Sequence, residues 1–194
     1  MFARTDRLLL RPCWPEDAQE LYYAIADEAI VRNLARAPWP YSESEAERFV
    51  ALKHSETYPT FLLMKRTDGA PRLIGACGLG KHGEVAELGY WISRAHWGFG
   101  YATEAAHATI GIAKAIGHQI LVASHFTDNP ASGRVLRKAG FRPTGRTEQR
   151  HSLGRGSSAE CALYECSLTG DDDGTVACMP VAPALGGYDR LKAA

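Results

Sequence analysis

The stretch Trp97-Gly98-Phe99-Gly100-Tyr101-Ala102-Thr103-Glu104-Ala105 joins an expected strand to the first turn of an expected helix. Gly98 and Gly100 allow the backbone to approach a ligand closely. The first N–H groups of a helix lack partners within the helix, and the helix dipole places positive charge at the same end. The stretch therefore predicts an anion site of the kind that holds phosphate groups. The competing interpretation is a tight strand-to-helix turn in which glycine serves only the backbone geometry, and the glycines alone do not separate the two.

Two common nucleotide motifs do not fit this stretch. A dinucleotide fingerprint needs a third glycine where Thr103 stands, and a Walker-type loop needs a Gly-Lys-Ser/Thr sequence that is absent. A second informative stretch, Asn129-Pro130-Ala131-Ser132-Gly133-Arg134-Val135-Leu136-Arg137-Lys138-Ala139-Gly140-Phe141, follows the next expected strand. Asn129 suits an N-cap and Pro130 a first helical position, so Ser132 lies in the first turn and faces the space between the two strands. Taken alone, this stretch predicts only a well-capped helix.

Length and composition are those of an ordinary globular chain. The 194 residues are 45% hydrophobic and 23% charged, which excludes a disordered chain, a collagen-like fibre and a disulfide-dense mini-protein. The 22 basic residues balance 22 acidic ones, so a surface-wide basic field for nucleic acid is not expected. No apolar run is long enough to cross a membrane, and the charged N-terminal segment does not resemble a signal peptide.

Cysteine usage points to a reducing compartment. The five cysteines form no C-x-x-C pair, so neither a disulfide framework nor a zinc site is predicted. We expect a cytoplasmic protein that has no metal-ligand set.

Hydrophobic periodicity and turn residues predict a mixed sheet with helices on both of its faces. The expected strands are 8–10, 60–66, 72–80, 84–93, 119–125, 141–151 and 158–168, and the expected helices begin at Pro15 or cover 42–53, 101–116 and 130–138. We expect one domain over 1–168. Beyond it, 169–194 is rich in Gly, Pro and Ala and is predicted to be a loosely ordered appendage. The alternative is that 176–185 packs on the body or on a second subunit, which leaves a homodimer open.

At this spacing and in this strand–helix order, the two quoted stretches together resemble the GNAT acetyltransferase superfamily. The resemblance extends over about 5–168, includes Glu87-Leu88-Gly89-Tyr90-Trp91-Ile92, and is strongest toward the branch of ribosomal-protein N-acetyltransferases, which modify protein N-termini. It implies an α/β (α+β) GNAT fold. Its sheet is mixed and mostly antiparallel, and two parallel strands splay apart at the cofactor cleft.

The same resemblance implies a binding site for acetyl-CoA as cosubstrate. Backbone amides of the glycine turn would hold its pyrophosphate, namely those of Gly98, Phe99, Gly100, Tyr101, Ala102 and Thr103. The pantetheine arm would lie against the backbone of Tyr90, Trp91 and Ile92, with Asn129 and Ser132 as further contacts. Trp97 replaces the Gln or Arg that begins the family's turn, and this loss matters little if the backbone does the binding.

Direct transfer of an acetyl group to an amine needs a neutral nucleophile, a donor for the oxyanion and a proton for the leaving thiolate. Glu87 is the predicted base, directly or through a water. The alternative for Glu87 is an ordinary ion-paired residue on a half-exposed strand. A strand N–H near Trp91 or Ile92 is the expected oxyanion donor. His125 is a reserve base, whereas Ser124 occupies a second family position that often carries a glutamate.

Protonation of the leaving thiolate is the step with the weakest support, because Leu136 stands where many family members carry a tyrosine that acts as general acid. Ser132 is the substitute that the resemblance implies. Trp14, Trp39 and Tyr41 are expected either to wall the acceptor site or to plug a small core.

The leading hypothesis is an N-acetyltransferase acting on a protein N-terminus or a small primary amine. Its main rival is a non-catalytic acyl-CoA sensor on the same fold. A third hypothesis is a structural α/β domain that binds no cofactor.

Overall fold

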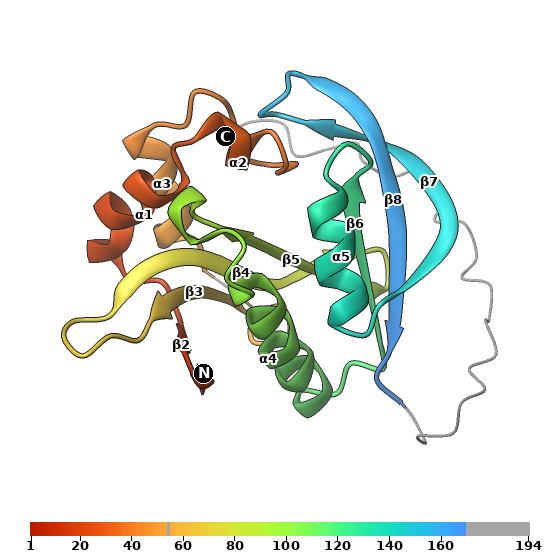
Figure 1. Cartoon of the computed structure of the whole chain (residues 1–194), viewed down its shortest axis with the longest axis horizontal. Coiled ribbons are helices and arrows are strands. Elements are labelled where there is room, and N and C mark those ends of the chain that lie inside the picture. Colours follow the sequence, from red (N-terminus) through yellow and green to blue (C-terminus); the bar gives the residue numbers. More distant parts are fainter. Residues whose placement is uncertain (54, 170–194) are drawn as a thin grey trace.

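A computed structural model describes residues 1–53 and 55–169, which form one eight-stranded sheet flanked by helices (Figure 1). The strands follow the order β1-β2-β3-β4-β5-β6-β8-β7, and only β5 and β6 run parallel to each other. The mixed, mostly antiparallel sheet predicted from the sequence is therefore confirmed. The predicted appendage lies outside the described residues, except for Thr169.

The bounds of the elements agree closely with the sequence pattern. The strands are β1 (Ala3–Arg4), β2 (Leu8–Arg11), β3 (Thr60–Lys65), β4 (Arg72–His82), β5 (Val85–Ile92), β6 (Ile120–Phe126), β7 (Arg142–Ser152) and β8 (Ser157–Ser167). The helices are α1 (Ala18–Ile25), α2 (Glu28–Val31), α3 (Glu43–Ala51), α4 (Tyr101–Ala115) and α5 (Pro130–Lys138), with 3₁₀ turns η1 (Pro15–Asp17) and η2 (Arg94–His96). The sequence missed β1, α2 and η2, because elements of two to four residues are too short to show a period.

Helices cover both faces of the sheet, as expected. Side chains alternate along β3, so Leu62 and Met64 pack in the core cluster under α1–α3, whereas Phe61 and Leu63 pack under α4 on the other face. Figure 1 shows α4 and α5 beside each other over this second face. One core cluster thus lies under α1–α3 and two lie on the opposite face, and the residues of β5 are divided between the two faces.

The division of β5 positions the candidate site. Ala86, Leu88 and Tyr90 belong to the core beneath α4 and α5, and Trp91 packs in the core beneath α1–α3. Glu87 has the same parity as Trp91 and therefore points to the α1–α3 face. The candidate base and the side chain of Tyr90 lie on opposite faces of the sheet.

The parallel pairing between β5 and β6 is very short. It consists of Ala86 opposite Leu121 and Glu87 opposite Val122. Beyond these pairs, β5 continues along β4 up to Ile92, and β6 continues along β8 up to Phe126. The two strands therefore part, which confirms the splayed pair. On the side that faces β6, the backbone of β5 beyond Glu87 has no strand partner in the described part of the chain.

Candidate active site

The glycine turn and the start of α4 form an open cradle of backbone donors. Gly98 and Gly100 both have φ of +83°, a conformation that favours glycine. Gly100 is the N-cap of the 15-residue helix α4, and no side chain caps the helix there. A Cβ built on Gly98 would meet no atom within 4 Å. The first N–H groups of α4 therefore receive no side-chain cap, and the turn before them has room at Gly98, which fits an anionic diphosphate.

A side-chain clamp holds this turn against the start of the chain. Arg7 Nη1 donates to the Phe99 carbonyl at 2.9 Å, and Arg7 Nε donates to Glu104 Oε2 at 2.7 Å. The Arg7 backbone N–H and the Thr5 hydroxyl donate to Glu104 Oε1 at 2.9 and 2.5 Å. The guanidinium also lies 4.6 Å from the ring centroid of Tyr101, the first residue of α4. The loop between β1 and β2 therefore holds the glycine turn and the first turn of α4 together.

The sequence analysis did not identify Arg7 as a site residue, although the position of its partner Glu104 gave a weak signal. Glu104 stands in the first turn of a predicted helix, where a carboxylate is favoured by the helix dipole. Burial alone would raise the pKa of Glu104, but the hydrogen bonds from Thr5 and Arg7 outweigh burial and lower that pKa below its usual value. Arg7 and Glu104 are 97 residues apart, so no local pattern joins them.

Trp97 has a structural role in place of the Gln or Arg of the family pattern. Its indole N–H donates to the carbonyl of Ile92 at 2.6 Å, and the guanidinium of Arg94 lies 4.5 Å from a Trp97 ring centroid. Ile92 itself is buried in the core with Tyr101. The turn is thereby attached to the end of β5, between the cradle and the strand that is expected to carry the pantetheine arm.

Tyr90 and Ser132 meet across the gap between β5 and α5. Their hydroxyl oxygens are 2.8 Å apart, and the Tyr90 hydroxyl also donates to the Ser132 carbonyl at 3.2 Å. Asn129 caps α5 as predicted, accepting from the Ser132 N–H at 3.4 Å. Burial raises the pKa of Tyr90 to about 12, against a smaller opposing effect of the Ser132 bond. Its phenol therefore keeps its proton near neutral pH and can act as a hydrogen-bond donor.

The side chain of Leu136, four positions after Ser132, takes no part in these polar contacts. It is 1% exposed and belongs to the core beneath α4 and α5. Tyr90 packs against the core cluster that contains Leu136, so its hydroxyl lies near the position where the sequence lacks one. The sequence analysis assigned only the backbone of Tyr90 to the site, because a strand pattern does not specify what a side chain reaches across the gap.

On the opposite face, Glu87 lies in a network of polar side chains. Its Oε1 accepts from Arg150 Nη1 at 2.5 Å and from the Ser124 hydroxyl at 3.2 Å. Arg150 also donates to Glu148 Oε1 at 2.8 Å. Burial lowers the pKa of Arg150, but the two carboxylates raise it further, so this guanidinium stays charged. Glu87 is therefore ion-paired, as the alternative interpretation of this residue expected. Its partner Arg150, on β7, was not identified from the sequence.

The remaining candidates lie apart from this network. His125 Nδ1 is 2.8 Å from the Phe126 carbonyl and Nε2 is 3.4 Å from the Tyr164 hydroxyl, so both ring nitrogens have partners. Tyr41 is 7% exposed and belongs to the core under α1–α3. Trp14 and Trp39 are partly exposed, and the Arg11 guanidinium lies 4.0 Å from a Trp14 ring centroid. Of the three aromatic candidates, the structure places Tyr41 in a core.

The sequence matches a known family over most of its length. A family model described as the acetyltransferase (GNAT) domain matches residues 7–142. The chain belongs to the GNAT acetyltransferase family. It is 30% identical over 148 residues to the uncharacterized N-acetyltransferase YoaA of Bacillus subtilis (strain 168), covering 73% of this chain and 82% of that protein. The family resemblance inferred from the two quoted stretches is thus confirmed, and the protein is an N-acetyltransferase.

Solved structures of GNAT proteins share the fold. A GNAT-family acetyltransferase from Bacillus anthracis superposes with a TM-score of 0.74 at 22% identity, covering 87% of this chain and 99% of that chain. RimL, the ribosomal L7/L12 alpha-N-protein acetyltransferase, whose structure is in complex with coenzyme A, superposes with a TM-score of 0.71 at 20% identity, covering 86% and 98%. Among the described residues of this GNAT acetyltransferase, no helix is long and apolar enough to cross a bilayer.

The clamp predicts a stability difference that depends on pH. Glu104→Gln should lower the free energy of unfolding at pH 7 by roughly 1–3 kcal/mol, because charge-assisted bonds to Arg7 and Thr5 are weakened. Since folding lowers the pKa of Glu104, its contribution is complete above the unfolded pKa of about 4.3 and disappears as the pH falls through the folded value. Urea unfolding from pH 7 to pH 3 should therefore show the wild-type and variant curves converging in acid.

Glu43→Gln is the matched control, because Glu43 also occupies the first turn of a helix but is exposed. Its effect should be small at every pH. Equal losses in the two variants would show that the helix dipole, rather than the clamp, stabilises Glu104.

Proposed function

We propose that this GNAT enzyme transfers the acetyl group of acetyl-CoA to a primary amine, with protein N-termini as the first acceptor class to test. The observation that carries the proposal is the parting of β5 and β6 beside the uncapped N-terminus of α4. Unpaired strand backbone suits the amide-bearing pantetheine arm, and free helical N–H groups suit the pyrophosphate. The two features adjoin, because the glycine turn connects the end of β5 to α4. The likeness to RimL, an alpha-N-protein acetyltransferase, supports the choice of acceptor.

The residues that would hold the cofactor are those of the turn and of the strand edge. The open space at Gly98 is the part of the cradle that a Cβ would fill. When bound, acetyl-CoA supplies a thioester whose carbon–sulfur bond breaks as the amine nitrogen attacks the carbonyl. Everything else that the reaction needs comes from the protein: alignment of the amine, a proton acceptor for it and a proton donor for the departing sulfur.

The hydroxyl pair of Tyr90 and Ser132 is the proposed proton donor. Ser132 Oγ would bond to the departing thiolate, and Tyr90 Oη, 2.8 Å from Ser132 Oγ, would stabilise the serine hydroxyl as it does so. A thiolate is a tolerable leaving group, because the pKa of a free thiol is about 8.5. A hydrogen bond in the transition state can therefore be sufficient. In this proposal the pair would replace the tyrosine that is missing at Leu136, and that missing tyrosine is the main argument for a sensing module.

Glu87 is the proposed proton acceptor, acting through an intervening water. Its carboxylate is held by Arg150 and Ser124, and its side chain is 18% exposed. An α-amine, with a pKa near 8, needs less help to become neutral than a lysine amine, whose pKa is about 10.4. General-base assistance is typically worth about 10²–10⁴-fold, and an α-amine acceptor needs less of it than a lysine amine does.

The cofactor site is tested with two glycines of similar geometry. Gly98 and Gly117 have φ of +83° and +95°, and a Cβ at either would meet no atom within 4 Å. Gly98→Ala and Gly117→Ala should therefore lose similar stability, on the order of 1 kcal/mol. Only Gly98→Ala should weaken coenzyme A binding, by about tenfold or more. Calorimetric titration and thermal unfolding measure both quantities, and equal affinities would place the cofactor elsewhere.

The hydroxyl pair is tested by steady-state kinetics. Ser132→Ala and Tyr90→Phe should each lower kcat by about 10²-fold while changing acetyl-CoA affinity little, and the double variant should be hardly worse than Ser132→Ala. Burial raises the pKa of Tyr90 to about 12, so the phenol remains protonated up to pH 10. The pH dependence of kcat below pH 10 should therefore have the same shape in Tyr90→Phe as in the wild type. Tyr23→Phe, at an exposed tyrosine, is the control. Losses that are equal in kcat and affinity would reduce Ser132 to a binding residue.

The acceptor is tested by mass spectrometry. The enzyme is incubated with acetyl-CoA and either a library of peptides with free N-termini or a panel of small amines. We expect acetylated peptide N-termini, whereas acetylation confined to small amines or to lysine side chains would reject the proposed acceptor and retain the transferase activity. Absence of acetyl transfer to any amine would reject the proposed function as a whole.

A further inference from the structure

The two faces of the sheet are joined differently across the split between β5 and β6, which separates a β1–β5 half from a half made of β6, β8 and β7. On the face covered by α4 and α5, one apolar core contains residues of both halves, including Leu88 of β5 and Leu121 of β6. On the other face, the core under α1–α3 takes its strand residues from β2, β3, β4 and β5, and within the described ranges no residue of β6, β7 or β8 belongs to it. On that face the apolar core therefore stops at β5.

A polar junction crosses the split where this core stops. We call residues 28–35, which begin with α2, the strap. Val31, at the end of α2, is fully buried in the core under α1–α3. Farther along the strap, the Ala35 carbonyl accepts from the N–H of Leu153 in the β7–β8 turn at 3.0 Å, and Figure 1 shows this turn beside α2. The strap is thus anchored in one half of the sheet and bonded to the other.

The strap and the β7–β8 turn are in close contact. Ser152 is fully buried, and its hydroxyl donates to the Leu34 carbonyl at 2.7 Å. A Cβ built on Gly154 would lie 2.6 Å from the Val31 carbonyl oxygen, a distance at which one of the two backbones must move. Gly154 therefore allows the turn to lie directly against the strap.

Asp128, in the loop between β6 and α5, connects the strap to the turn. Its Oδ2 accepts from Arg32 Nη2 at 3.0 Å and from Arg155 Nη1 at 2.8 Å, and its Oδ1 accepts from Arg155 Nη2 at 2.8 Å. Arg155 Nε also donates to the Arg32 carbonyl at 2.6 Å. The hydrogen bond from Arg155 lowers the pKa of Asp128, so this carboxylate is charged at neutral pH. One carboxylate thus joins three loops that come from both halves of the sheet.

The candidate catalytic pairs cross the same split. Glu87 on β5 bonds to Ser124 on β6 and to Arg150 on β7. Tyr90 on β5 bonds to Ser132 on α5. The distances within these pairs depend on how the two halves are placed, and only two ladder pairs join β5 to β6. A polar junction opens more readily than an apolar core, because its opening exposes little apolar surface.

We propose that the strap and the β7–β8 turn position the two halves of the sheet for acetyl transfer, with Asp128 and Arg155 as positioning residues. The inference rests on the proposed function, because the pairs that are positioned contain the proposed proton acceptor and the proposed proton donor. Asp128 and Arg155 act through the placement of the two halves and not on the reacting atoms.

Two variants release the junction in different ways. Asp128→Asn removes the negative charge at the centre of the ion pairs. Gly154→Ala places a methyl group against the Val31 carbonyl and pushes the turn away from the strap. Each should lower kcat by about tenfold through lost alignment and change coenzyme A affinity by less than about twofold, because the cradle and β5 lie in one half. The double variant should be hardly worse than either single variant, since both release the same junction.

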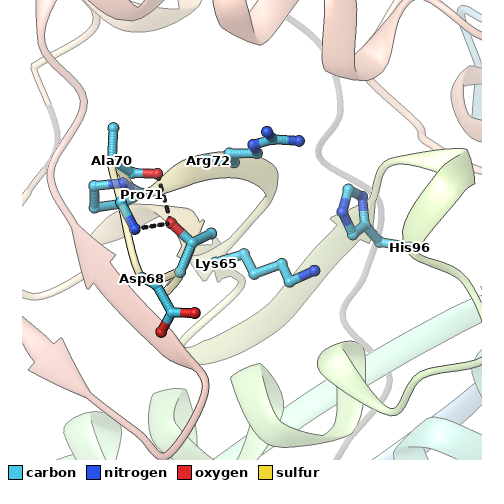
Figure 2. A pocket seen from close by; sticks show the side chains of 8 residues that line it. Lys65, Asp68, Ala70, Pro71, Arg72 and His96 are labelled. Carbon is cyan, nitrogen blue, oxygen red and sulfur yellow. Dashed lines mark hydrogen bonds between the residues drawn. The ribbon is translucent and has the colours of Figure 1, made fainter.

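Two matched controls remove similar groups elsewhere. Glu45→Gln removes a carboxylate that pairs with Arg48 within α3. Gly69→Ala changes a glycine of the β3–β4 turn, where a Cβ would approach only Thr67 Oγ1, at 4.0 Å. Figure 2 shows the hollow that this turn lines. Both controls should leave kcat unchanged, and losses in kcat equal to those of the junction variants would overturn the proposal.

Hydrogen exchange tests the junction without acetyl transfer. In both junction variants, the Leu153 amide and the amides of the β5–β6 ladder should exchange about tenfold faster than in the wild type, because the two halves part more often. The Ser93 amide, which donates to the Ile74 carbonyl within one half at 2.8 Å, should be unchanged. Equally faster exchange at Leu153 and Ser93 would indicate a general loss of stability and would contradict the proposal.

The remaining outcomes separate the claims. Unchanged kcat together with faster exchange would show that the junction holds the halves but does not position the reaction, which rejects the proposal. Lower kcat with unchanged exchange of the β5–β6 ladder would place the defect elsewhere and would also reject it. If the wild type acetylates no amine, the proposed function fails, and exchange of the ladder still decides whether the junction holds the two halves together.

Discussion

The short ladder between β5 and β6 governs the organisation of this molecule. Two pairs, Ala86 with Leu121 and Glu87 with Val122, join the two halves of the sheet. Beyond them each strand follows a different antiparallel partner, β4 or β8, so the sheet opens as its strands advance. An open edge of this kind leaves backbone donors and acceptors free to bind a ligand. If β5 and β6 paired along their full length, no backbone groups would remain there for an extended, amide-bearing arm.

The contacts around this opening come from distant parts of the chain. Arg7 precedes β2 and supports the glycine turn through Phe99 and Glu104. Arg150, on β7, reaches Glu87 on the face opposite α4, while Tyr90 reaches Ser132 on the other face. The candidate base and the candidate proton donor are thereby separated by the sheet itself. In the proposed mechanism, the amine would reach the thioester carbonyl from the side of Glu87, and the thiolate would leave toward the Tyr90–Ser132 pair.

Much of the local structure could be predicted from the sequence. Ser42 caps α3, accepting from the N–H of Glu45, Asn129 caps α5, and Gly117 follows α4 with φ of +95°. These features depend on residues three or four positions apart, and a one-dimensional pattern contains such distances. The contacts of Glu87 and Tyr90 could not be predicted, because Arg150 and Ser132 lie 63 and 42 residues away. The roles of the site residues stay predictions, to be tested by the variants above.

Short-range chemistry in the chain was sufficient to specify the elements, the glycine turn with its free helical donors, and membership of the GNAT family. The tertiary structure determined which charged side chains lie next to each other. Lys65 opposes Arg72 because of the register between β3 and β4, and Glu87 meets Arg150 although β6 and β8 stand between their strands in the sheet order. Hydrophobic alternation determines which face a side chain takes, but its neighbour depends on strand order and register, which also depend on the turns and on burial of one face of the sheet.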